Sequence, residues 1–116
     1  MANTADEVFA ALANPTRREL LGRLLATQGE PVQRLAAHFD MTRPSVSEHL
    51  KVLRDAGLVT AERAGRQHIY RLADDALRPV QDWLEPYERF WRDKLKSMSD
   101  LLDAEAAADD PEGNGG

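Results

Sequence analysis

Apolar residues recur at intervals of three and four along the first half of the chain, which predicts α-helices that each bury one face. The first helix is expected to end before Asn14-Pro15, where Asn14 predicts an N-cap and Pro15 the first residue of the next helix. The apolar positions of that second helix run over 16–27, and Gly29 follows it. A third helix, of about two turns, is predicted over 32–39.

A fourth helix is predicted over 43–56, with Thr42 as its N-cap and Gly57 after its last turn. Its polar residues are distributed over the surface that the buried stripe leaves free. That stripe consists of apolar residues spaced by four and three positions: Val46, Leu50 and Leu53.

The periodicity then changes from helical to extended, which predicts two strands over 58–63 and 66–72. Gly65 can supply the positive φ that a tight hairpin turn requires. Because two strands alone are marginally stable, this hairpin must pack against the helices.

A long helix with a wide, aromatic apolar face is predicted after Asp74-Asp75. Pro86 lies inside the pattern and should bend this helix or break it into two. Residues 104–116 offer little to bury and are expected to form a flexible acidic, glycine-rich tail. The remaining residues, 1–103, are expected to form one domain that is mostly helical with a small β-hairpin, an α+β arrangement.

The composition is typical of a single globular domain, with 116 residues, 42% hydrophobic and 30% charged. No stretch approaches the roughly 18 apolar residues of a membrane span, and residues 1–8 lack the basic start and apolar core of a signal peptide. The absence of cysteine excludes disulfides and thiolate metal sites. We therefore expect a cytoplasmic protein.

The net charge of −5 is unfavourable for a nucleic-acid binder, but the charge is unevenly distributed. Residues 41–73 hold six Lys or Arg against three acids, a net charge of +3. Residues 74–116 hold five against twelve, a net charge of −7. The basic middle segment can therefore face a polyanion, which the whole-chain charge conceals.

The helices over 32–39 and 43–56, joined by a tight turn, are typical of a helix-turn-helix, whose second helix enters the DNA major groove. Arg can bridge guanine O6 and N7, while Ser and His bind base edges or phosphates. The alternative is that these polar residues are only the solvated side of an amphipathic helix. The candidate DNA-binding residues of this segment are Thr42, Arg43, Ser45, Ser47, His49, Lys51 and Arg54.

The hairpin favours the DNA-binding interpretation because its tip is basic. Arg63, Arg66, Gln67 and His68 surround the glycine turn, a composition suited to contacts with phosphate or the minor groove. A basic hairpin tip is by itself usually only a soluble turn. Directly after a helix-turn-helix, it predicts the wing of a winged helix.

Taken together, these segments resemble the ArsR family of winged-helix repressors over residues 5–103. The resemblance implies a homodimer whose first and last helices pair across a twofold axis, with each fourth helix in a major groove. It also implies repression of a promoter, often the protein's own. The matching motifs are Asn14-Pro15-Thr16-Arg17-Arg18, residues 35–39, Val46-Ser47-Glu48-His49-Leu50-Lys51-Val52-Leu53-Arg54, Ala56-Gly57-Leu58-Val59, and Gly65-Arg66 before Tyr70-Arg71-Leu72.

The residues support a dimer independently, because the last helix has more apolar surface than a small core can cover. A twofold dimer predicts a palindromic operator with half-sites roughly 34–36 Å apart. The alternative is that both tryptophans close the core of a single protomer. The predicted interface consists of Val8, Phe9, Leu12, Trp83, Leu84, Tyr87, Phe90, Trp91, Leu95, Met98 and Leu102.

The sequence departs from the family's metal-sensing members, which use cysteine pairs or His and carboxylate ligands that are missing here. No metal and no cofactor is therefore expected, and His38 alone is a poor site. Ser47, His49 and Asp55 do not predict a hydrolase, since Ser47 and His49 face different directions on one helix. Instead, protonation of His49 or His68 near phosphate suggests a DNA affinity that increases below about pH 6.5.

Two other functions stay open at this point. The chain could be a winged-helix module that binds another protein through its aromatic helix. It could also sense an apolar small molecule lodged beside Trp83, Tyr87 and Trp91. The sequence identifies no effector.

Overall fold

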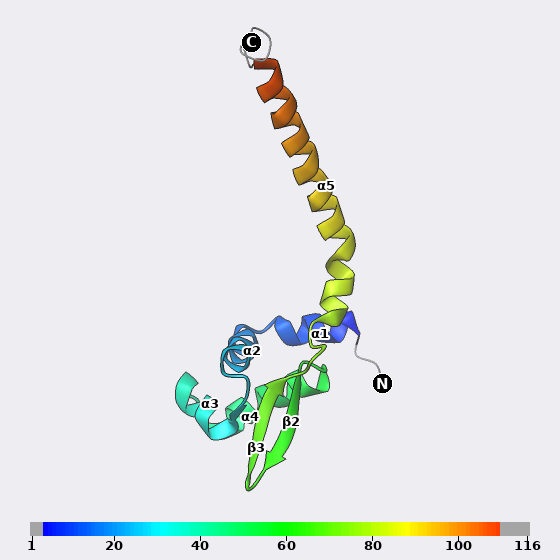
Figure 1. Ribbon diagram of the computed structural model, residues 1–116. Coiled ribbons are helices and arrows are strands. Elements are labelled where there is room, and N and C mark those ends of the chain that lie inside the picture. The colour runs from blue at the N-terminus through cyan, green and yellow to red at the C-terminus, as the bar shows by residue number, and fades with distance from the viewer. Residues whose placement is uncertain (1–3, 110–116) are drawn as a thin grey trace. The chain divides into compact units, whose positions relative to one another are not determined.

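The computed structural model describes residues 4–109, which fall into two compact units, one ending at Asp82 and the other beginning at Trp83. The first unit holds four helices and a small sheet, and the second is formed by most of the last helix, α5 (Figure 1). The predicted fold, mostly helical with a β-hairpin between the fourth and fifth helices, is confirmed.

The helices of the first unit begin where short polar side chains cap their amides. The side-chain oxygens of Thr4, Asn14 and Thr42 each accept a hydrogen bond from the backbone N–H three residues later. The predicted caps at Asn14 and Thr42 are confirmed. These helices are α1 (Ala5–Leu12), α2 (Pro15–Thr27), α3 (Val32–Phe39) and α4 (Arg43–Asp55).

The sheet has three antiparallel strands in the order β1-β3-β2. The predicted hairpin is β2 (Val59–Ala64) and β3 (Gln67–Leu72), joined through Gly65 at φ +64°. The sequence did not predict β1 (Glu30–Pro31), which places Glu30 opposite Tyr70 of β3. Two residues are too few to show an alternating pattern, so the sequence predicts only a connection between the helices over 16–27 and 32–39.

The core of the first unit is a cluster of aliphatic side chains contributed by every helix of the unit. The predicted stripe on α4 is confirmed, since all three of its residues are fully buried. Leucines of α2 and α3 and the residue just before β2 meet this stripe, so α4 is fixed against its neighbours. The largest buried side chains are Val8, Leu20, Leu24, Leu35, Val46, Leu50, Leu53 and Leu58.

The last helix, α5 (Arg78–Asp109), is longer and less interrupted than the sequence predicted. It runs through Pro86 without a break, although proline cannot donate the amide hydrogen bond to the Asp82 carbonyl. It also continues past residue 104, where a flexible tail was expected, because alanine has the highest helix propensity and 104–108 is Ala-rich. The rest of the predicted tail, 110–116, lies outside the described residues.

None of the helices within residues 4–109 combines the length and the apolar character needed to cross a bilayer.

We expect Gly29→Ala to lower the free energy of unfolding by about 1–3 kcal/mol, because Gly29 adopts a φ of +134° that side chains disfavour. An added Cβ would also lie 2.9 Å from Cγ of Arg71 and 3.3 Å from Cγ2 of Ile69. Urea unfolding measures the change.

The matched control is Gly22→Ala on the exposed surface of α2, where an added Cβ meets nothing within 4 Å. This substitution should raise stability by about 1 kcal/mol, because alanine is the better helix former. Equal changes in the free energy of unfolding for the two variants would show that the backbone conformation and the neighbours of Gly29 do not require glycine.

Candidate nucleic-acid interface

The buried stripe of α4 divides the remaining surface of that helix into two flanks. Successive residues turn by about 100°, so positions four or three apart stay on one flank while positions two apart do not. Arg43, Ser47, Lys51 and Arg54, spaced by four, four and three, share one flank. Ser45 and His49 lie on the other side of the stripe, and both are half-buried.

The first flank of α4 faces the hairpin across two adjoining hollows of about 400 Å³ each. We call them together the α4–wing groove. Ser47 and Tyr70 line both hollows, so the groove is continuous along α4 and β3. Its lining residues are Val32, Gln33, Arg43, Ser47, Lys51, Arg54, Asp55, Arg66, Gln67, His68 and Tyr70.

The structure therefore brings together some of the predicted DNA-binding residues and separates others. Arg43, Ser47, Lys51 and Arg54 of α4 meet Arg66, Gln67 and His68 of the hairpin in the groove. Ser45 and His49 do not line the groove, because helical geometry turns them to the opposite flank of α4, and their expected DNA contacts stay a prediction. Thr42 is exposed, with its hydroxyl oxygen engaged in the cap of α4.

The predicted DNA-binding cations differ in whether the chain itself pairs them. Lys51 Nζ pairs with Asp55 Oδ2 at 2.8 Å, and Arg63, which does not line the groove, donates from Nε to the Gly65 carbonyl at 3.1 Å. The exposed guanidinium groups of Arg43, Arg54 and Arg66 have no hydrogen bond or ion pair with any residue in 4–109. These three charges are available to an external anion.

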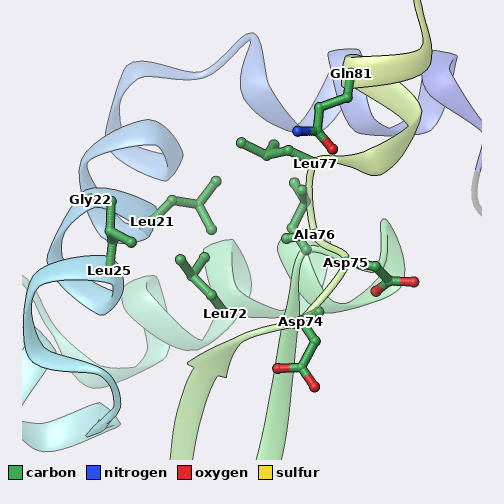
Figure 2. A pocket seen from close by; sticks show the side chains of 11 residues that line it. Leu21, Gly22, Leu25, Leu72, Asp74, Asp75, Ala76, Leu77 and Gln81 are labelled. Carbon is green, nitrogen blue, oxygen red and sulfur yellow. The ribbon is translucent and has the colours of Figure 1, made fainter.

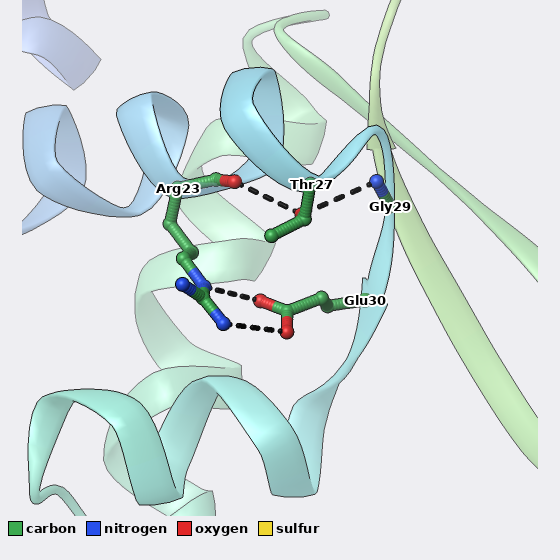
Figure 3. Close-up of polar contacts among 4 residues, drawn as sticks. All are labelled: Arg23, Thr27, Gly29 and Glu30. Atoms are coloured by element: carbon green, nitrogen blue, oxygen red, sulfur yellow. Dashed lines mark hydrogen bonds and ion pairs between the residues drawn. The ribbon is translucent and has the colours of Figure 1, made fainter.

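The hairpin is connected to α2 by an ion pair that β1 makes. Arg23 of α2, whose side chain is 31% exposed, donates from Nε and Nη2 to the Glu30 carboxylate, at 2.7 and 3.0 Å (Figure 3). Glu30 is only 4% exposed, and its backbone pairs with that of Tyr70 in β3. The pair therefore fastens the sheet to α2, and the sequence analysis missed it because the partners are joined across a helix end.

This hydrogen bonding to Glu30 raises the pKa of Arg23 above its ordinary value; burial opposes the shift and the charge of Glu30 adds to it. A raised pKa means that Arg23 stabilises the fold while it is protonated, and this stabilisation is lost as strongly alkaline pH removes that proton. The anchor is therefore insensitive to pH in the physiological range.

Arg17 and Arg18, whose motif resembles the family, serve the fold. Arg17 Nε donates to the Ala11 carbonyl at 2.7 Å, and Arg18 donates to the Leu12 carbonyl at 2.7 Å. These carbonyls end α1, where cations are favourable because they meet the negative end of the helix dipole.

The predicted dimer residues divide between the core and α5. The prediction that Val8 lies in the dimer interface is wrong, because this residue is 0% exposed and packs into the core of its own protomer. Phe9 and Leu12 are half-buried on α1. Trp83 is 49% and Trp91 61% exposed, so neither tryptophan closes a core. The other predicted residues of α5 are exposed too: Leu84, Tyr87, Phe90, Leu95, Met98 and Leu102.

A separate apolar hollow of about 350 Å³ lies beside α2, at the segment that leads into α5. The side chains of Leu21, Leu72 and Leu77 point into it, while the carboxylates of Asp74 and Asp75 point away (Figure 2). The aromatic residues proposed for a small-molecule site do not line this hollow. Trp91 instead lines a shallow apolar groove on α5, with Phe90, Leu95, Met98 and Leu101 among its neighbours.

Comparison with known proteins places this architecture among bacterial transcription factors. A family model described as a helix-turn-helix domain matches residues 12–62. The HTH-type transcriptional regulator Rv2034 of Mycobacterium tuberculosis is 38% identical over 100 residues, which cover 86% of this chain and 90% of that relative.

Solved structures agree with this result. A crystal structure of an ArsR family transcriptional regulator, RHA00566, is 34% identical with a TM-score of 0.64, covering 75% of this chain and 89% of that one. The homodimeric winged helix-turn-helix DNA-binding domain of Mb0332 from Mycobacterium bovis is 28% identical with a TM-score of 0.60, covering 72% of this chain and 77% of that one.

We expect Glu30→Gln to lower the free energy of unfolding by about 1–2 kcal/mol, because the buried side chain loses its charge-assisted hydrogen bonds. Glu62→Gln is the matched control, since Glu62 forms an exposed pair with Arg71 at 2.9 Å and should change stability by less than about 0.5 kcal/mol. Urea unfolding of both variants tests the difference. Equal losses would show that burial does not distinguish the two pairs.

Proposed function

Because the chain belongs to the ArsR family of winged helix-turn-helix transcriptional regulators, we propose that it binds double-stranded DNA through the α4–wing groove. In this proposal, α4 enters the major groove and the β2–β3 hairpin contacts the adjacent backbone. The observation that carries the proposal is the convergence of three unpaired guanidinium groups, those of Arg43, Arg54 and Arg66, on one surface. Because these positive charges are concentrated on one surface, the negative net charge of the chain does not prevent DNA from binding there.

The positions of these side chains suggest different roles. Arg43 is the first residue of α4, the end that contacts base edges in this class of motif, and its fork suits guanine O6 and N7. Arg54 in the last turn and Arg66 at the hairpin tip suit phosphates, which they would neutralise without regard to sequence. We propose secondary contacts for the other predicted residues: Thr42, Ser45, Ser47, His49, Lys51, Arg63, Gln67 and His68.

We further propose that two chains associate through the exposed apolar face of α5 and bind a palindromic operator. A continuous face of large apolar side chains on one helix is typical of a surface that a partner covers. The homodimeric state of the similar Mycobacterium bovis domain supports the same arrangement. DNA binding and dimerisation would both lie within residues 1–103. A dimer bound at a promoter would repress transcription by excluding RNA polymerase.

Arg66→Ala and Arg43→Ala should affect DNA binding in different ways. Removing the phosphate contact should weaken binding to every duplex alike and reduce the slope of log affinity against log salt by about 1. Removing the base contact should reduce the preference for the operator over random duplex by roughly 1–3 kcal/mol. Fluorescence anisotropy at several salt concentrations measures both quantities on an operator selected from random DNA.

The control for these measurements is Arg92→Ala, which removes one cation from α5 and none from the groove. Arg92→Ala should leave the operator preference unchanged. The proposed DNA surface is wrong if Arg43→Ala and Arg66→Ala behave like this control.

Trp91→Glu should convert the dimer to a monomer, because it places a charge in the apolar face of α5. Lys96→Glu is the matched control, since helical spacing puts Lys96 on the opposite side of α5 from Trp91. Sedimentation velocity measures the mass of each protein, and circular dichroism checks that the helix persists. A Trp91→Glu protein that still sediments as a dimer would contradict the proposed interface.

A further inference from the structure

Glu48 is an acidic residue in the part of α4 that the proposed function places in the major groove. It is the sixth residue of the helix and is exposed. Its position is two residues from both Val46 and Leu50 of the buried stripe, which turns it away from the core. Sequence alone does not mark it as a DNA-binding residue, since a negative charge is unfavourable next to phosphate.

No other charged group of α4 neutralises Glu48. Its carboxylate forms no hydrogen bond or ion pair with the residues that the structure describes. Lys51, three positions later, lies within reach along the helix, but its Nζ is 2.8 Å from Asp55 Oδ2. Asp55, the other acidic residue of α4, is therefore paired. Glu48 is the acid of this helix whose carboxylate is free on the outward surface.

A free carboxylate that approaches DNA is repelled by the backbone and attracted only by hydrogen-bond donors on base edges. In the major groove, cytosine presents the N4 amino group, whereas guanine N7 and O6 and thymine O4 are acceptors. Adenine presents the N6 amino group beside the N7 acceptor, whose lone pair opposes a carboxylate. Cytosine is thus the base that such a group tolerates best.

On the basis of the proposed function, we propose that Glu48 selects cytosine at one position of each half-site by accepting a hydrogen bond from cytosine N4. Its contribution is to specificity more than to affinity, because the same charge weakens binding to every other sequence. The cationic groove supplies attraction to any duplex, and Glu48 removes part of that attraction where cytosine is missing.

The test is selection of bound duplexes from random DNA by the full chain, its Glu48→Gln variant and its Glu19→Gln variant, which changes an exposed acid of α2 outside the groove. Both substitutions remove one exposed negative charge from the chain. Only Glu48→Gln should change the selected site: a cytosine preferred about tenfold by the wild type should be lost, with adenine favoured because glutamine can bind its N6 and N7 together.

The outcomes separate this inference from the proposed function. If the wild type enriches a site that Glu48→Gln enriches unchanged, the role of Glu48 is overturned while DNA binding stands. If the wild type enriches no sequence, both are overturned. If Glu19→Gln loses the same cytosine, the effect belongs to the overall charge of the chain, and the assignment to Glu48 is wrong.

Discussion

The position of the hairpin beside α4 depends on the two residues of β1. A two-stranded ribbon is marginally stable by itself. Here Glu30, itself buried, joins β3 through its backbone and α2 through its ion pair with Arg23. Leucines of α2 pack in the same core as the buried stripe of α4. Glu30 therefore connects the sheet to the helices that fix the orientation of α4. Together with the burial of Leu58 and Val59 in that core, this connection holds the hairpin beside α4 and so defines the groove between them.

Charge pairing within the chain decides which side chains can act on a ligand. The ion pairs Lys51–Asp55 and Glu62–Arg71 satisfy charges inside the protein. Arg43, Arg54 and Arg66 are left over, and so is Glu48. A surface with several free cations and one free anion is suited to discrimination, because the cations attract any polyanion and the anion penalises all but the correct donor pattern. The net charge of the whole chain, −5, does not reveal this local combination of free cations and one free anion.

The features that the sequence predicted correctly are those controlled by neighbours along the chain. Asn14 and Thr42 cap helices because their side chains reach amides three residues away, and the stripe on α4 follows from helical spacing. The errors concern relations between distant segments or patterns with too few residues. Strand β1 is too short to be recognised, and Val8 faces inward although it was expected at the interface. In α5, the helix propensity of alanine outweighed the composition expected of a tail.

The hydrogen bonds from Arg17 and Arg18 to the end of α1 make the first two helices thermodynamically inseparable. An eight-residue helix has little tendency to form alone in water, because nucleation costs more than so few hydrogen bonds return. Here the carbonyls that terminate α1 find donors only once α2 has begun. The N-terminal segment therefore gains its order in the same cooperative step as α2, and its backbone amides should exchange with solvent at the rate of that larger opening.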